Sequence, residues 1–115
     1  MTIRISDNLD IFLETIPSSV ELVEAHGTST KVGDATELST LTRLWTDAES
    51  GDNVAVGSIK SQIGHLKAAA GIAGIIKSVM ALHHRTIPPS AGFETPNPTV
   101  DWPNIPFFVP TQARE

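Results

Sequence analysis

The order of two neighbouring segments, a β-branched run and then a long apolar run, constrains the fold of this chain most strongly. Val54, Val56 and Ile59 predict a strand over residues 54–59, and the apolar run that follows predicts a helix from about Leu66. Apolar side chains cover this second segment almost all round, so the helix is expected to be buried rather than amphipathic. The proline pair at 88–89 is expected to end it.

A second strand and helix precede this pair. Residues 20–25 predict a strand buried on both faces, because their apolar side chains do not alternate cleanly. Gly33 and Asp34 are expected to open a helix, with Asp34 as its N-cap and Glu37 completing a capping box. The order strand–helix–strand–helix predicts the α/β class, with the two main strands parallel.

The two ends of the chain are less regular. Residues 2–5 alternate like a short strand, and residues 9–16 predict a short helix that Pro17 ends. Residues 47–53 read as a polar loop. The tail from Ser90 is rich in proline and predicts an extended loop with a short edge strand over 105–109.

We expect one domain at residues 20–115, preceded by a segment of uncertain role at 1–19. The aromatic residues are interpreted as core or docking residues: Trp45, Trp102, Phe107 and Phe108.

Composition excludes several classes of function. A net charge of −5 argues against nucleic acid as the main partner, since phosphate binding needs a positive surface. The chain contains no cysteine, which excludes a disulfide, a thiolate metal site and a cysteine nucleophile within it. The start does not resemble a signal peptide, and the longest apolar run is too short and too interrupted for a membrane span. A cytoplasmic location is therefore expected.

Both predicted strands are followed by a histidine beside a glycine, His26-Gly27 and Gly64-His65. The carboxyl ends of parallel strands meet at one edge of a sheet, where ligands bind in α/β proteins. An imidazole beside a helix N-terminus tends to stay neutral, and two such imidazoles could donate hydrogen bonds to one oxyanion. Two unrelated turn histidines explain the same pattern, and the residues alone do not decide between these interpretations.

The polar residues around the histidines also have alternative interpretations. Lys60 is either a solvated charge or a partly buried cation balanced by Glu37. Thr28 and Thr30 could be turn hydroxyls that bind the local backbone. A metal site is a third possibility for the region, although no compact ligand spacing supports it and no metal is predicted. Its ligands would be His26, His65, Asp34 and Glu37.

Three motifs together resemble the C-terminal half of β-ketoacyl synthases. They are HGTSTKVGDATEL, GSIKSQIGHLKAAAGIAGIIK and IPPSAGFETPNP, and the resemblance covers residues 20–109. The condensing domains of type I polyketide and polyunsaturated fatty acid synthases look most similar. This resemblance implies a thiolase-like fold, in which the chain forms one αβα portion of a layered αβαβα domain.

The resemblance also implies roles for individual residues. His26 and His65 match the two histidines that bind the thioester carbonyl of a malonyl extender and stabilise the enolate formed on decarboxylation. Lys60 matches the lysine that supports the second histidine, and Glu37 matches the acid in its network. Two further residues match the threonines that contact the phosphopantetheine arm of an acyl carrier protein: Thr28 and Thr30.

The expected function is therefore part of a decarboxylative Claisen condensation between a malonyl-type thioester and an acyl thioester. The family's nucleophile is a cysteine of the N-terminal half and this chain has none, so the resemblance implies that the missing half supplies it. The resemblance also implies a homodimer of the full domain. The chain ends before the glycine- and phenylalanine-rich loop of the family, which predicts a partial domain. An inactive remnant that serves as a docking or dimerisation module is the alternative.

Overall fold

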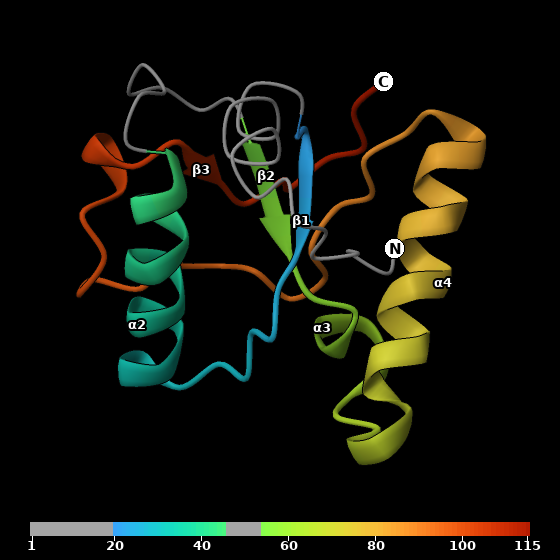
Figure 1. Cartoon of the computed structure of the whole chain (residues 1–115), viewed down its shortest axis with the longest axis horizontal. Helices are drawn as coiled ribbons and strands as arrows, with labels where there is room; N and C mark the ends of the chain where they lie inside the picture. Colours follow the sequence, from blue (N-terminus) through green and yellow to red (C-terminus); the bar gives the residue numbers. More distant parts are fainter. Residues whose placement is uncertain (1–19, 46–53) are drawn as a thin grey trace, which may run out of the picture.

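The computed structural model of this chain describes residues 20–45 and 54–115 (Figure 1). The short strand and helix expected within residues 1–19, the boundary drawn there, and the polar loop expected at 47–53 lie outside the described residues. The described part contains a small sheet with helices on its two sides.

Three parallel strands form this sheet in the order β1-β2-β3, so the central strand pairs with both neighbours. They are β1 (Leu22–Glu24), β2 (Val54–Gly57) and β3 (Phe107–Phe108). Val23 is in register with Val56, and Val54 with Phe107. The predicted parallel pairing and the predicted edge strand are confirmed, although each strand is shorter than expected. In β2 the reason is local, because the backbone turns at Ser58 and Ile59 into a helix.

Helices α2 and α4 lie on opposite sides of the sheet in Figure 1. The α-helices are α2 (Lys31–Thr42), α3 (Lys60–Ile63) and α4 (Ala70–His84). Single 3-10 turns follow α2 at η2 (Arg43–Trp45), precede α4 at η3 (Lys67–Ala69) and precede β3 at η4 (Trp102–Asn104). No helix in the described ranges has both the length and the hydropathy that a bilayer crossing requires.

The hydrophobic core lies between α2 and the sheet. It consists of Leu38, Trp45, Val54, Val56, Ile105 and Phe107. The Trp45 and Phe107 rings meet edge to face with their centroids 5.1 Å apart, and the Phe107 side chain is fully buried. This geometry is one that aromatic pairs prefer, and it adds to the free energy of burying both rings. The prediction that these two aromatic residues belong to the core is confirmed.

The start of α2 differs from the expected capping box. Thr30 is the N-cap, with extended backbone dihedrals, and its Oγ1 accepts a hydrogen bond of 3.2 Å from the Gly33 backbone N–H. The helix therefore begins at Lys31, before the predicted start, and Asp34 lies in its first turn. Glu37 bonds to the backbone of residues outside the helix. The capping-box prediction was wrong because Thr30 already supplies the acceptor that the helix N-terminus needs.

The prediction that the long helix is buried was also wrong. Within α4 the buried residue is Gly74. Its large apolar side chains are between 46% and 79% exposed, and we call them the apolar face of α4: Ile72, Ile75, Ile76, Val79, Met80 and Leu82. The helix meets the sheet at Gly74, where a Cβ would lie 3.0 Å from the Glu24 Cγ of β1. The helix ends at His84, where Arg85 adopts the left-handed conformation, so the proline pair is not what stops it.

Candidate functional site

The two predicted histidines lie side by side. His26 follows the end of β1, as expected, whereas His65 follows the short helix α3 and Gly64 rather than the strand itself. Lys60 is accordingly the first residue of α3 and does not lie at a strand end. The two imidazole rings meet edge to face with centroids 5.9 Å apart. Both residues are exposed.

The protonation pattern of His65 follows from its hydrogen bond. Its Nδ1 accepts a bond of 2.9 Å from the backbone N–H of Lys67. A ring nitrogen that accepts a hydrogen bond carries no proton, so the proton of the neutral imidazole lies on Nε2. Nε2–H is therefore the atom of His65 that can donate to a ligand. An imidazole in this state stabilises a developing oxyanion without giving up its proton.

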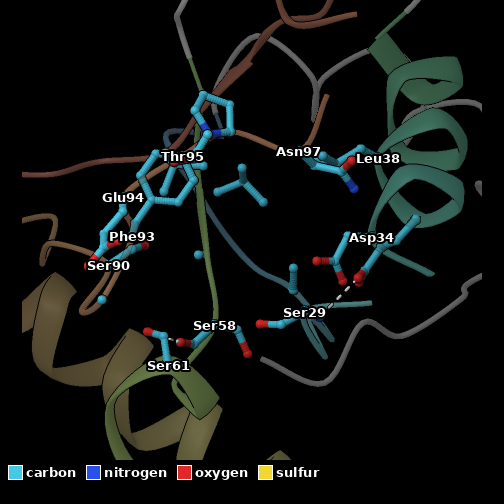
Figure 2. Close-up of a pocket in the computed structure, with 18 of the residues that line it drawn as sticks. Ser29, Asp34, Leu38, Ser58, Ser61, Ser90, Phe93, Glu94, Thr95 and Asn97 are labelled. Carbon is cyan, nitrogen blue, oxygen red and sulfur yellow. Dashed lines mark hydrogen bonds between the residues drawn. The ribbon is translucent and has the colours of Figure 1, made fainter. Parts of the chain in front are cut away.

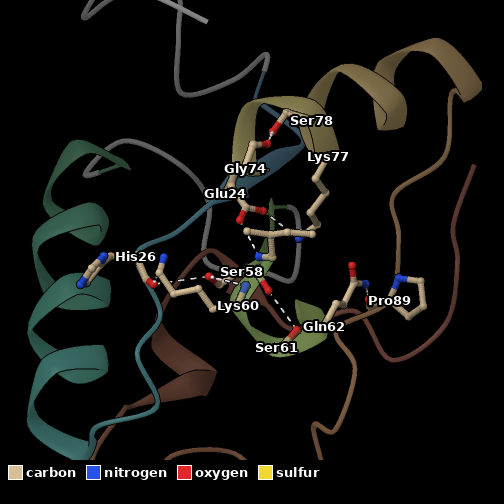
Figure 3. A network of polar contacts seen from close by, with 11 residues as sticks. Glu24, His26, Ser58, Lys60, Ser61, Gln62, Gly74, Lys77, Ser78 and Pro89 are labelled. Carbon is tan, nitrogen blue, oxygen red and sulfur yellow. Dashed lines mark hydrogen bonds and ion pairs between the residues drawn. The ribbon is translucent and has the colours of Figure 1, made fainter. Parts of the chain in front are cut away.

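The backbone of His26 is held on both sides by charged side chains. The Glu37 carboxylate accepts hydrogen bonds from the N–H groups of His26 and Gly27, at 2.7 and 3.0 Å. The Lys60 ammonium donates to the His26 carbonyl at 2.7 Å, and the Ser58 hydroxyl donates to the same oxygen at 3.3 Å (Figure 3). Lys60 and Glu37 thus act on one peptide segment, through the backbone of His26 and Gly27.

The turn at Gly27 explains why this segment needs a glycine. Gly27 has a φ of +42°, in the left-handed region, and a Cβ built there would lie 2.9 Å from the Ser58 Cβ. A side chain at this position would be strained and would also displace Ser58. Ser58, which is buried and polar, was not predicted as a site residue. Its place between a buried strand and Lys60 was the signal available.

Thr28 and Thr30 lie together at the entrance to α2. A Cβ built on Gly33 would lie 2.3 Å from the Thr30 hydroxyl oxygen and 3.8 Å from that of Thr28, so both hydroxyls are near this glycine. The interpretation of Thr30 as a hydroxyl that binds the local backbone is confirmed by its N-cap bond. Its O–H remains able to donate, because the cap uses only the oxygen as acceptor.

Glu24 and Lys77 form a second charged feature, which the sequence analysis also missed. The Glu24 Oε2 lies 2.7 Å from the Lys77 Nζ, and the two side chains are only 16% and 7% exposed. The Glu24 Oε1 accepts a bond of 2.5 Å from the backbone N–H of Ile59. The available signal was a glutamate inside a predicted buried strand and a lysine inside an apolar helix.

A cavity of about 610 Å³ lies beside the Gly27 turn, on the α2 side of the sheet. Figure 2 shows Phe93 and Thr95 facing Asp34 and Leu38 across it. Its lining includes groups that hold His26: Gly27, Glu37 and Ser58. Two buried oxygens at its wall, Asp34 Oδ1 and Ser90 Oγ, have no hydrogen-bond partner among the described residues.

The four residues considered as metal ligands do not form a metal site. Within ranges 20–45 and 54–115 no group of three or more histidine, cysteine, aspartate or glutamate side chains is arranged to hold an ion. Glu37 is occupied by two backbone N–H groups, and the ring nitrogen Nδ1 of His65 is occupied by a third. The geometry therefore favours hydrogen-bond donation by the histidines.

Comparison with known proteins shows the same architecture in characterised synthases. The family model for the β-ketoacyl synthase C-terminal domain matches residues 13–94. The chain is 48% identical over 99 residues to a phenolphthiocerol/phthiocerol polyketide synthase of Mycobacterium tuberculosis, covering 86% of this chain and 6% of that protein. It is 44% identical over 98 residues to a hybrid PKS-NRPS synthetase of Aspergillus terreus, covering 85% of this chain and 15% of that protein. The chain therefore spans only a small part of the length of these relatives.

Solved structures of ketosynthases have the same fold over the matched part of the chain. The ketosynthase from module 1 of the bacillaene synthase of Bacillus amyloliquefaciens superposes with a TM-score of 0.82 at 43% identity, over 86% of this chain and 18% of that one. The module 6 ketosynthase of the Bacillus subtilis bacillaene synthase gives a TM-score of 0.80 at 39% identity, over 85% and 18%. The predicted thiolase-like α/β fold is confirmed, and the chain belongs to the β-ketoacyl synthase C-terminal domain family.

Proposed function

We propose that this chain supplies the two-histidine part of a condensing site in a β-ketoacyl synthase. The reaction is the decarboxylative Claisen condensation of a malonyl-type thioester with an acyl thioester. The observation that carries the proposal is the pairing of His26 and His65, whose ring centroids are 5.9 Å apart, with the His65 proton on Nε2. Two imidazoles that converge in this way can bind one carbonyl oxygen.

The chemistry assigned to the pair is stabilisation of an enolate. When the bond between the malonyl carboxylate and its neighbouring carbon breaks, carbon dioxide leaves and the electron pair moves onto the thioester oxygen. His65 donates Nε2–H to that oxygen, and His26 donates from the facing ring. The enolate carbon then attacks the acyl thioester carbonyl, and the carbon–sulfur bond of that thioester breaks, so the thiolate leaves as the new carbon–carbon bond is completed. Lys60 adds a positive charge beside His26 and fixes its carbonyl.

The acyl group needs a nucleophile that this chain does not contain. Thioester chemistry of this kind uses a cysteine, and the chain has none. We assign the cysteine to an N-terminal half of the complete synthase. The apolar face of α4 supports this assignment, because an apolar surface of this kind marks a contact with another protein part. A homodimer of the complete domain is part of the proposal.

The extender is proposed to arrive on the phosphopantetheine arm of an acyl carrier protein. Thr28 and Thr30 present hydroxyl groups at the entrance to α2, on the segment that follows His26. Hydroxyl groups can bind the amide groups of such an arm as donors or acceptors. A cytoplasmic location is part of the proposal.

The test measures decarboxylation of a malonyl thioester by the complete ketosynthase domain that includes this chain. The variant His65→Ala is expected to lower the rate by roughly 10²–10³-fold, as the loss of one oxyanion donor does. His84→Ala is the matched control, since His84 lies at the far end of α4. A His65→Ala rate equal to that of the control would refute the assigned role.

The alternative is a docking or dimerisation module without turnover. The exposed apolar face of α4 and the lack of cysteine favour it. This alternative predicts that the purified chain self-associates in analytical ultracentrifugation and that adding a cysteine-bearing ketosynthase half restores no decarboxylation. Restored decarboxylation that depends on His65 would exclude it.

A further inference from the structure

Glu24 connects three elements around the histidine pair. It lies on β1 two residues before His26, and its Oε1 accepts the N–H of Ile59, the N-cap of α3. Its Oε2 pairs with Lys77 of α4 (Figure 3). The side chain also packs closely on α4, because a Cβ built on Gly74 would lie 3.0 Å from the Glu24 Cγ.

Stability alone does not explain a buried ion pair at this position. Removing two charges from water costs free energy that their attraction only partly offsets, and well-packed apolar residues are often as stable or more stable. The carboxylate instead holds two elements in a fixed relative orientation, because each of its oxygens has its own partner. One oxygen is held by Lys77, and the other then faces the Ile59 N–H at 2.5 Å, where it fixes the start of α3 against β1.

The position of α3 matters because it leads directly to the second histidine. Lys60 is its first residue and donates to the His26 carbonyl, while Gly64 and His65 follow its last turn. α3 is only one turn long and has no side-chain cap of its own. A helix of this length has little stability by itself, so its placement depends on bonds to neighbouring elements.

We propose that Glu24 is a positioning residue, which through the Ile59 N–H holds α3, and therefore His65, at its distance from His26. Lys77 orients the carboxylate. The catalytic consequence of this placement rests on the proposed function, whereas the placement itself does not. The acceptor oxygen of Glu24, and not its charge, is the required feature.

The experiment compares two double variants that differ in this oxygen. Glu24→Leu/Lys77→Met removes the acceptor and leaves no buried charge without a partner. Glu24→Gln/Lys77→Met is also neutral but keeps an oxygen that can accept the Ile59 N–H. Glu21→Leu, at an exposed position just before β1, is the surface control.

The first readout is a nuclear Overhauser cross-peak between ring protons of His26 and His65 in the full chain labelled on histidine. The wild type, the glutamine double variant and Glu21→Leu are expected to show it. The leucine double variant is expected to lose it while keeping the Trp45–Phe107 contact of the core. A cross-peak retained in the leucine variant, or absent from the wild type, overturns the proposal.

The second readout is decarboxylation by the complete ketosynthase domain. The leucine double variant is expected to lower kcat by roughly 10²-fold with little change in KM, as a small misplacement of a catalytic group does. The glutamine variant is expected to retain most of the rate. Equal losses in the two variants would mean a structural role only and would overturn the proposal. A His65→Ala domain that keeps its activity would instead refute the proposed function and leave the cross-peak result standing.

Discussion

The imidazole of His26 meets that of His65 edge to face, with ring centroids 5.9 Å apart, although His26 follows β1 and His65 follows α3. The facing arrangement depends on bonds to the backbone around His26 and at the start of α3. The backbone around His26 is held by Glu37, Lys60 and Ser58. The start of α3 is held by Glu24. The geometry of the pair is therefore a property of the surrounding hydrogen bonds.

The tautomer of His65 can be measured by nuclear magnetic resonance. We expect ¹⁵N spectra of the imidazoles to show an unprotonated Nδ1 and a protonated Nε2 at neutral pH, because Nδ1 accepts the Lys67 N–H. His83, an exposed residue in the last turn of α4, is the reference ring. A spectrum with the His65 proton on Nδ1 would contradict the assignment of Nε2–H as the donor.

Replacing Glu37 by glutamine should loosen the His26 turn. The amide side chain would place an NH₂ group against one of the two backbone N–H donors that the carboxylate now accepts. Losing a hydrogen bond to a charged group costs about 1.5–3 kcal/mol, so Glu37→Gln should lower the free energy of unfolding by that order. Glu94→Gln, at an exposed carboxylate, should change it little. Equal denaturation midpoints for the two variants would contradict the stabilising role of the Glu37 carboxylate at the His26 turn.

Gly27→Ala should destabilise the chain more than Gly92→Ala. Both glycines have positive φ, so both variants incur the strain of a left-handed conformation, about 1–2 kcal/mol. Only at Gly27 would the new Cβ meet another atom closely, 2.9 Å from the Ser58 Cβ, whereas the space around Gly92 is open. Urea denaturation of both variants measures the difference. If Gly92→Ala lowered the free energy of unfolding more than Gly27→Ala, the close contact with Ser58 would not be an important source of destabilisation.

Thr30→Ala should remove the N-cap of α2. The loss of such a cap typically costs about 1 kcal/mol of stability. Thr40→Ala is the matched control, because Thr40 lies inside the same helix on an exposed face and alanine has the higher helix propensity. Thermal unfolding should show a lower Tm for Thr30→Ala only. A lower Tm for both variants would indicate a general sensitivity of the helix to threonine loss.

The apolar face of α4 should bind an apolar fluorescent dye. We expect Ile72→Gln and Ile76→Gln to reduce dye fluorescence of the chain with little effect on its unfolding, since both side chains are more than half exposed. Leu44→Gln removes an exposed leucine outside this face and serves as the comparison. In a complete ketosynthase domain the two isoleucine variants should be destabilising, because there the face is proposed to be covered. Stability equal to wild type in that domain would contradict the proposed covering.

The sequence predicted the larger features of the fold because these depend on local patterns. β-branched runs marked two of the strands, and the strand–helix–strand–helix order predicted parallel pairing. The two glycine–histidine pairs predicted that the histidines lie close together, and their rings are neighbours, although His65 follows α3 and not the end of a strand. The capping box failed because two competing local motifs, at Thr30 and at Asp34, were both available and only the structure shows which is used.

By itself, the sequence determined which residue types stand near the site, the absence of a cysteine and the class of the fold. Only the tertiary structure decided how those residues are connected. Glu37 binds the His26 turn rather than its own helix, and Glu24 reaches Ile59 of α3 and Lys77 of α4. These bonds join segments far apart in the chain. A carboxylate can satisfy its hydrogen bonds with many partners, so its partner is selected by the packing of the elements and not by local sequence.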